Sequence, residues 1–317
     1  MKVEIKRSLA EVRSLIDFVG NAYDLIFVDG FLLHSRENDV YRVSDCRREY
    51  ILKIYPVSKM SDKKLEFIDR QLLNFYGVSY IVRNKSGKLK ISIRYPEGFR
   101  NAVLFYYFEG IDDENNSSDF RALGKEVARL HSIGNKNIKI ETIPYLEFEN
   151  SIVDACLTNK SKYKLLDALY FIKEFPKDKL GNLEIGLCHG DCHIENAIRT
   201  SMGVFLIDFD FMRFDYLASD LASIIWANHY GMGVDSQDLE NFFSGYSGEK
   251  SIKKMCRDVL LYFIVKREIT YILSYVARQD VIGKLFVNDE LITNRLTKIN
   301  SVHMMLEGKS ILRLIVD

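Results

Sequence analysis

The chain has 317 residues, 47% of them hydrophobic, and its 44 Lys and Arg residues equal its 44 Asp and Glu residues in number. A chain of this length can bury a large core, and it exceeds what one compact domain usually spans, so two lobes are expected. The balanced charge excludes a strong overall attraction to nucleic acid or to an anionic membrane, and neither is expected as a partner.

Cysteine usage and hydropathy predict a soluble, cytoplasmic protein. The five cysteines are odd in number and scattered along the chain, which suits reduced thiols in a cytosol. The first residues, MKVEIKRSLAEV, are too charged for a secretory signal. The longest apolar run, VLLYFIV, is far shorter than the roughly 20 residues that span a bilayer.

The pattern of the predicted elements changes along the chain. Strand-like segments dominate residues 25–108, whereas helical periodicity dominates after residue 118. This switch predicts two lobes of different make-up, with a boundary near Glu109 and Gly110. We therefore expect an N-terminal lobe over residues 1–108 and a C-terminal lobe over residues 109–317.

A lysine interrupts one of the predicted strands, YILKIY. Alternation along a strand puts Lys53 on the same face as Ile51 and Tyr55. Since Lys is rarely buried without a partner, an anionic group such as the side chain of an acidic residue is expected beside it. The next predicted helix offers Glu66 and Asp69 on one face, and the pattern leaves both open. The alternative is an edge-strand lysine whose charged end reaches solvent.

The segment CHGDCHIENAIRTSMGVFLIDFD, residues 188–210, carries the strongest chemical signal. It spaces Asp191, Asn196 and Asp208 like the base, the metal-binding Asn and the metal-binding Asp of a kinase. AIRT, SMG and VFLID predict a hairpin that returns Asp208 to the side of Asn196. Carboxylate and amide oxygens suit Mg²⁺, while Asp191 would accept the proton of an acceptor hydroxyl.

Two other interpretations of this segment exist. Isolated Asp and Asn residues often only cap helices or form turns, but here the whole set occurs in order. Cys188, His189, Cys192 and His193 could be named as a zinc cluster from their residue types. Zinc patterns separate two ligand pairs by a dozen or more residues, so crowding within six positions argues against zinc.

HGDCHIEN followed by LIDFD resembles the aminoglycoside phosphotransferase and choline kinase family, whose fold is similar to that of protein kinases. The segments SRENDVYRV, YILKIY, PEGFRNAVLFYYFEG and ASDLASIIW extend the resemblance over about Phe31 to Trp226. It implies an α+β, bilobal, protein-kinase-like fold, with a small antiparallel β-sheet in the N-lobe and a larger, mainly helical C-lobe. In such a fold the N-terminal lobe, residues 1–108, would bind nucleotide, and the C-terminal lobe, residues 109–317, would carry the catalytic residues and bind the substrate.

The resemblance also implies roles in the catalytic loop. It assigns Asp191 as the catalytic base and Asn196 and Asp208 as magnesium ligands. His189 would brace this loop from within, and Asp220 would support it from the following helix.

Further positions are implied for binding ATP between the lobes. Lys53 would contact the phosphates, and adenine would bond to backbone near Tyr106 and Phe108. The segment FLLHSRENDVY has no GxGxxG pattern that would let backbone approach the phosphates closely. Ser35 and Asn38 could bond phosphate oxygens there, although an ordinary polar hairpin turn is an equal alternative.

The function so implied is transfer of the γ-phosphate of MgATP to a hydroxyl of a small molecule resembling an aminoglycoside, amino alcohol, sugar or homoserine. An aminoglycoside would favour an acidic pocket, yet the C-terminal acidic residues are interspersed with lysines and the signal is weak. The alternatives are a bacterial stress-type serine/threonine protein kinase and a non-catalytic pseudokinase that binds a partner. Neither the acceptor nor the oligomeric state follows from the pattern.

Overall fold

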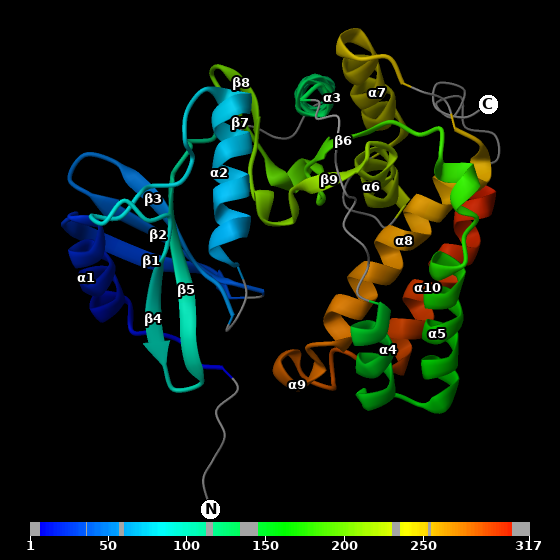
Figure 1. The fold of residues 1–317 in the computed structure, drawn as a ribbon, viewed down its shortest axis with the longest axis horizontal. Coiled ribbons are helices and arrows are strands. Elements are labelled where there is room, and N and C mark those ends of the chain that lie inside the picture. Colours follow the sequence, from blue (N-terminus) through cyan, green and yellow to red (C-terminus); the bar gives the residue numbers. More distant parts are fainter. Residues whose placement is uncertain are drawn as a thin grey trace, which may run out of the picture. The chain divides into compact units, whose positions relative to one another are not determined.

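The computed structural model of the protein describes residues 7–35, 37–56, 60–111, 117–133, 145–229, 235–252 and 255–305. Contacts divide the chain into two compact units, the N-terminal unit Met1–Glu109 and the C-terminal unit Gly110–Asp317. Figure 1 shows that the first contains the large sheet and the second most of the helices.

The N-terminal unit is built on a five-stranded antiparallel sheet of order β1-β2-β3-β5-β4. Its strands are β1 (Phe27–Ser35), β2 (Asp39–Asp45), β3 (Glu49–Ile54), β4 (Ile91–Tyr95) and β5 (Gly98–Tyr106). The helices α1 (Val12–Tyr23) and α2 (Asp62–Tyr76) lie on opposite sides of this sheet (Figure 1).

The core of this unit follows from alternation along β3. Tyr50, Leu52 and Ile54 are buried in one hydrophobic cluster with the apolar face of α1. Because successive side chains point to opposite faces, Lys53 lies on the other face of the sheet. The sequence did not predict α1, which begins after Glu11, whose carboxylate accepts hydrogen bonds from the N–H groups of Arg13 and Ser14.

The C-terminal unit is mainly helical. Its helices are α3 (Ser117–His131), α4 (Tyr145–Asp154), α5 (Asn159–Lys173), α6 (Ala218–His229), α7 (Ser236–Glu249), α8 (Arg257–Val276), α9 (Gln279–Ile282) and α10 (Asp289–Met305). The sequence predicts a long amphipathic helix from about Ile252 to Ala277, and the structure has α8 there, beginning five residues later at Arg257.

Two glycines let α3 and α7 approach each other closely. A Cβ atom on Gly124 would lie 2.0 Å from the carbonyl oxygen of Phe242, and one on Gly245 would lie 1.9 Å from that of Arg121. Either distance is a severe clash, so each glycine is required by the backbone opposite. This packing carries His131, the last residue of α3, to the base of the predicted catalytic loop.

Four short strands frame that loop. They are β6 (Ile185–Cys188), β7 (Ala197–Thr200), β8 (Gly203–Leu206) and β9 (Arg213–Tyr216). β6 pairs with β9, and β7 pairs with β8 in the antiparallel hairpin that the sequence predicts. Short 3₁₀ turns lie between them at Ile194–Asn196 and Phe209–Phe211.

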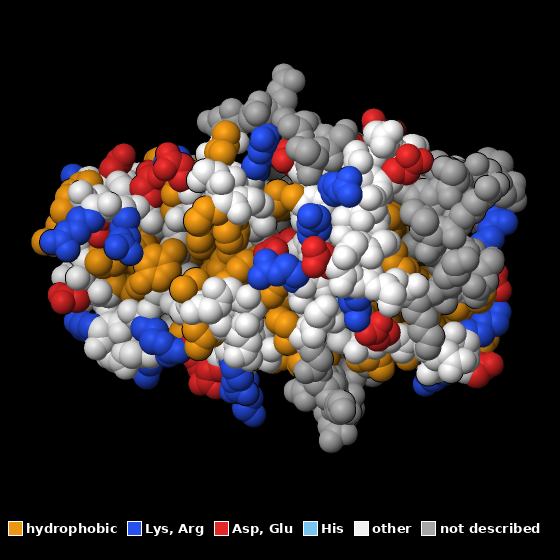
Figure 2. All heavy atoms as spheres, turned by 90° about the horizontal axis from the view of Figure 1, so that it is seen from above, with side chains coloured by type: hydrophobic (Ala, Val, Ile, Leu, Met, Phe, Trp, Pro, Cys, Tyr) orange, Lys and Arg blue, Asp and Glu red, His pale blue; other side chains and the backbone are white. Residues whose placement is uncertain are grey.

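The observed architecture confirms the predicted α+β fold class, with an antiparallel sheet in the first unit and a mainly helical second unit. On the face shown in Figure 2, acidic and basic side chains are interspersed, in keeping with their equal numbers. Among the described residues, none of the helices is both long and apolar enough to cross a membrane.

Candidate active site

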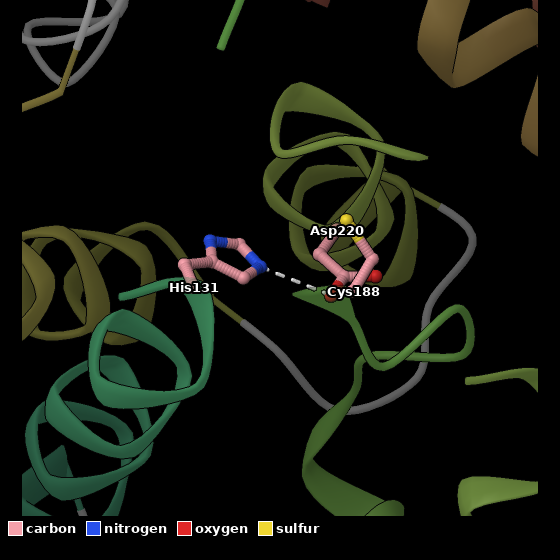
Figure 3. Close-up of side chains that lie close together, drawn as sticks. All are labelled: His131, Cys188 and Asp220. Atoms are coloured by element: carbon pink, nitrogen blue, oxygen red, sulfur yellow. Dashed lines mark hydrogen bonds and ion pairs between the residues drawn. The ribbon is translucent and has the colours of Figure 1, made fainter. Parts of the chain in front are cut away.

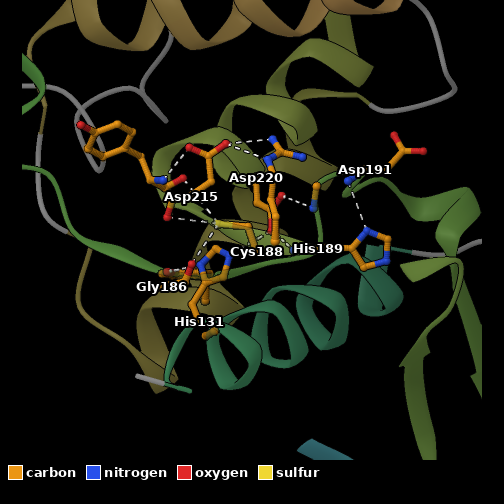
Figure 4. Close-up of polar contacts among 12 residues, drawn as sticks. His131, Gly186, Cys188, His189, Asp191, Asp215 and Asp220 are labelled. Carbon is orange, nitrogen blue, oxygen red and sulfur yellow. Dashed lines mark hydrogen bonds and ion pairs between the residues drawn. The ribbon is translucent and has the colours of Figure 1, made fainter. Parts of the chain in front are cut away.

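The loop between β6 and β7 is hydrogen-bonded to a buried carboxylate on α6. The backbone N–H groups of His189 and Gly190 donate to the two oxygens of Asp220, over 2.7 and 2.9 Å. Asp220 is 1% exposed, and a buried carboxylate requires such partners. The predicted supporting residue thus contacts the loop directly (Figure 4).

A second layer of contacts holds Asp220. His131 Nε2 lies 3.1 Å from Asp220 Oδ2, and His131 Nδ1 lies 2.8 Å from the hydroxyl of Tyr246 on α7. Burial by itself raises the pKa of Asp220, but the bond to His131 and the loop amides outweigh it, so the pKa lies below its ordinary value. Three helices therefore fix one end of the loop.

His189 is fully buried and ties the loop to the strand that precedes Asp208. Its Nε2 donates to the carbonyl oxygen of Ile207 over 2.8 Å, and its Nδ1 accepts from the N–H of Asp191 at 3.3 Å. The carboxylate of Asp191 is directed away from the buried cluster around Asp220 (Figure 4). With both ring nitrogens bonded, His189 has the contacts of a positioning residue.

Gly190 is required by the shape of this loop. Its φ of +84° lies in the left-handed region, and a Cβ atom would sit 2.2 Å from the carbonyl oxygen of Phe211. The HGD triplet therefore needs glycine for backbone reasons, which its sequence alone did not reveal.

Asn196 and Asp208 are neighbours through the hairpin. The N–H of Ile207 donates to the carbonyl oxygen of Asn196 at 2.9 Å. The Asn196 amide nitrogen donates to the carbonyl oxygen and to Oδ2 of Asp191, over 2.9 and 3.2 Å, which leaves the amide oxygen as a possible metal ligand. Asp208 is exposed and adopts φ +59°, uncommon for a residue with a side chain.

Asp191 is bonded to an arginine that the sequence did not predict. Arg267 Nη2 contacts Asp191 Oδ1, and His193 Nε2 lies 3.5 Å from the same oxygen. Burial raises the pKa of Asp191, but Arg267 and then His193 lower it by more, so the net pKa falls well below its usual range. The one signal for Arg267 was a charged KRE triplet inside an otherwise apolar helical segment.

The rejected zinc interpretation gains no support from the site. Among the described residues, the group with metal-like spacing is His131, Cys188 and Asp220, which includes only one of the four candidates (Figure 3). Asp220 is already bonded to two loop amides and His131. Burial raises the pKa of the Cys188 and Cys192 thiols, which disfavours the thiolate that zinc needs.

In the N-terminal unit, Lys53 is buried on β3 and its Nζ lies 5.7 Å from the centre of the Tyr55 ring. Asp69 faces inward on α2, where it accepts from Ser79 Oγ at 2.5 Å and from Arg83 Nη2 at 2.6 Å. Glu66 is exposed. A partnership of Lys53 with either acid stays a prediction.

The other predicted nucleotide-binding residues also have local contacts. Ser35 Oγ donates to Asp39 at 2.6 Å and accepts from Arg7 at 2.7 Å, so a phosphate would have to displace one of these bonds. Asn38 is buried. The N–H of Tyr106 donates to the carbonyl oxygen of Tyr80, and the ring of Phe108 lies 4.5 Å from that of Tyr80. Nucleotide contacts at these positions stay predictions.

The acidic residues near the expected acceptor region prove to be partly structural. Asp235 and Asp238 form a reciprocal capping box at the start of α7, each carboxylate accepting from the backbone N–H of the other. This local role accounts for two of the four acids, Asp235, Asp238, Glu240 and Glu249, that could have indicated a cationic acceptor.

Comparison with known proteins places this geometry in a family. The model of the phosphotransferase enzyme family matches residues 31–254, which include the loop, the hairpin and α6. The chain belongs to the phosphotransferase enzyme family. The predicted relationship and the predicted class of enzyme are thereby confirmed. An uncharacterized protein of Synechocystis sp., sll1119, is 27% identical over 267 residues, which is 74% of this chain and 69% of that protein.

Solved structures show the same fold at low sequence identity. An amicoumacin kinase, hAmiN, has a TM-score of 0.68 and is 17% identical, with 92% of this chain and 93% of that chain covered. A microcompartment-associated aminopropanol kinase has a TM-score of 0.67 and is 17% identical, with 94% of this chain and 99% of that chain covered. The choline kinase LicA from Streptococcus pneumoniae has a TM-score of 0.64 and is 16% identical, with 91% of this chain and 97% of that chain covered.

Proposed function

We propose that this phosphotransferase moves the γ-phosphoryl group of MgATP to a hydroxyl group of a small molecule. The observation that carries the proposal is the loop of Asp191 and Asn196, braced by Asp220 and joined through His189 to the strand before Asp208. Solved structures of this fold include an amicoumacin kinase in complex with AMP-PNP and a spectinomycin phosphotransferase in complex with ADP. These neighbours support ATP as the donor.

In the proposed reaction, the acceptor oxygen forms a bond to the terminal phosphorus while the bond between that phosphorus and the bridging oxygen of ADP breaks. The hydroxyl proton passes to the carboxylate of Asp191. Because the ion pair with Arg267 keeps this carboxylate ionised despite its burial, its main contribution is to orient the hydroxyl and to take the proton as transfer proceeds.

The residues present fit magnesium, since a carboxylate and an amide oxygen are hard ligands. Asp208 and Asn196 would hold the ion, which would neutralise negative charge on the phosphates. Lys53 would contribute a further positive charge to the phosphates, and His189 and Asp220 would position the loop. Phe108 and Tyr106 are proposed to provide backbone contacts to adenine.

The first test is consumption of ATP by the purified protein with magnesium, offered aminoglycosides, amino alcohols, sugars, hydroxy acids and generic protein acceptors. Asp191→Asn should lower turnover by at least about a thousandfold and leave nucleotide binding within a few-fold, because it removes the proton acceptor and preserves the shape. Asp208→Asn should weaken binding of the magnesium–nucleotide complex as well. Near-normal turnover by Asp191→Asn would refute the assignment of the base. Labelling of the protein acceptors alone would favour a protein kinase.

A further inference from the structure

The proposed catalytic base is not alone at the surface. Arg267 of α8 contacts Asp191 Oδ1, and the two side chains are 19% and 18% exposed. Both groups therefore reach solvent at the same point, although 76 residues separate them in sequence. Any acceptor whose hydroxyl approaches Asp191 must also meet the guanidinium of Arg267.

The guanidinium of Arg267 packs on the ring of Trp226, which has further contacts of its own. Its Cζ lies 5.0 Å from the centre of the Trp226 ring on α6. The indole N–H of Trp226 donates to Glu268 Oε2 at 2.7 Å, and Arg295 of α10 pairs with Glu268, with 2.6 Å between Nε and Oε1. Arg295 also lies over the Trp226 ring, at 5.7 Å. Stacking on a fixed aromatic ring restricts the arginine to a small region beside the base.

The guanidinium has hydrogen-bonding capacity left over. An arginine offers five N–H donors in a planar fork that matches a carboxylate or a phosphate. Within the described part of the chain, Arg267 contacts Asp191 through Nη2, and its buried Nε has no hydrogen-bond partner. An anion that draws the guanidinium toward solvent would offer an acceptor to this donor, which is buried while Arg267 contacts Asp191.

The surrounding charges disfavour a cationic acceptor. The nearby carboxylates of Glu268 and Asp215 are already paired, the first with Arg295 and the second with Arg213 and Lys266. Asp191 itself is paired with Arg267.

We propose that Arg267 recognises the acceptor, and that the acceptor is a hydroxyl compound bearing a carboxylate or phosphate group close to the reacting hydroxyl. Binding of this anion draws Arg267 away from Asp191 Oδ1 and leaves that oxygen open to the hydroxyl. This inference rests on the proposed function, since the bound compound is an acceptor only if the protein transfers phosphate to it. The binding of the compound can nevertheless be measured without turnover.

Trp226 is the single tryptophan of the chain, so its fluorescence reports on Arg267 directly. The intact protein is titrated with glycerate, glycerol 3-phosphate and glycerol, and with homoserine and 3-aminopropan-1-ol, with calorimetry in parallel. The carboxylate and phosphate members distinguish the two kinds of anion. Variants are Arg267→Gln, Arg267→Lys, and Arg278→Gln as a control that removes one charge just past the end of the same helix.

We expect saturable binding of at least one anionic compound and at least tenfold weaker binding of its uncharged or cationic partner. Arg267→Gln should weaken binding of the anionic compound by roughly tenfold to a hundredfold, because this is the contribution of a hydrogen bond to a charged group. Arg267→Lys, which keeps the charge and loses the fork, should fall between, and Arg278→Gln should bind like the parent.

The inference would be overturned if Arg267→Gln bound the anion as tightly as the parent, if the cationic compound were preferred, or if no anion gave a response at millimolar concentration.

The proposed function and this inference can fail separately. Phosphate transfer to a cationic acceptor, insensitive to Arg267→Gln, would refute the inference and keep the kinase. Anion binding that depends on Arg267, with no phosphate transfer to any hydroxyl compound, would keep the site and refute the kinase. If Arg267→Gln raised the KM for ATP and left acceptor binding unchanged, Arg267 would be assigned to the nucleotide instead.

Discussion

At the scale of single residues, the site depends on backbone shapes that few side chains tolerate. Gly190 and Asp208 both have positive φ, one at the loop and one at the end of the hairpin. Glycine reaches this region at little cost, whereas a residue with a side chain does so at about 1–3 kcal/mol, a strain that often marks functional positions. Asp208 bears that cost, which supports a role for its carboxylate.

Gly190→Ala should destabilise the protein by more than backbone strain alone. The new Cβ would meet the carbonyl oxygen of Phe211 at 2.2 Å, so the loop must shift, and turnover should fall with stability. Gly77→Ala is a matched control, because Gly77 has a similar φ of +74° and nothing within 4 Å of the added atom. We expect a loss of about 1 kcal/mol for Gly77→Ala and at least about 3 kcal/mol for Gly190→Ala in urea unfolding. Equal losses would show that the clash is relieved at no cost.

At the scale of elements, one carboxylate on α6 joins the loop to α3 and, through His131, to α7. Asp220 accepts from the backbone of His189 and Gly190 and from the His131 ring, and Tyr246 completes the chain of bonds. The close contact of α3 with α7 at Gly124 brings His131 into reach. The loop is thus positioned by helix packing as well as by its own sequence.

Asp220→Asn should lower the free energy of unfolding by about 3 kcal/mol at neutral pH, since it breaks a buried, hydrogen-bonded charge interaction. The folded state lowers the pKa of Asp220, so its contribution is present above the unfolded value of about 4 and is lost as the pH falls through the folded value. The difference between parent and variant should therefore shrink below about pH 4. Urea unfolding at pH 7 and at a series of pH values below about 4 measures it, with the exposed Asp167→Asn as a control. A difference that grew on acidification would contradict the lowered pKa of Asp220.

At the scale of the whole molecule, both compact units contain residues that are proposed to contact a phosphate group or a metal ion. The N-terminal unit contains Lys53 on a face of the sheet opposite its main core, and the C-terminal unit contains Asn196 and Asp208. A ligand that binds only the folded chain stabilises it by about 2.7 kcal/mol at a hundredfold excess over its Kd. Thermal unfolding can therefore report binding without any acceptor.

MgATP should raise the melting temperature of the parent by several degrees, and Lys53→Met and Asp208→Asn should each remove at least half of that rise. The reason is that each variant deletes a proposed contact with phosphate or metal, from one unit and from the other. Lys88→Met, in an exposed turn of the N-terminal unit, is the control for loss of a lysine. An unchanged shift in Lys53→Met would show that this buried lysine serves the sheet and not the nucleotide.

Much of the fold and the core of the site could be predicted from the sequence because they depend on local spacing. The hairpin of β7 and β8 follows from short apolar runs around a turn, and it brings Asp208 to Asn196 as expected. The alternation of β3 correctly separates Lys53 from Leu52 and Ile54. The family and the α+β fold class were confirmed for the same reason, since contiguous segments carry them.

What only the tertiary structure decided are contacts between distant segments, where packing and not spacing selects the partner. Arg267 reaches Asp191 because α8 passes beside the loop, and no pattern near either residue indicates the other. Ser35 turns to Asp39 and Arg7, and Asp69 to Arg83, through side-chain geometry that a linear pattern cannot specify. The sequence by itself determined which side chains the loop contains, whereas helix packing determined which charged group lies beside Asp191.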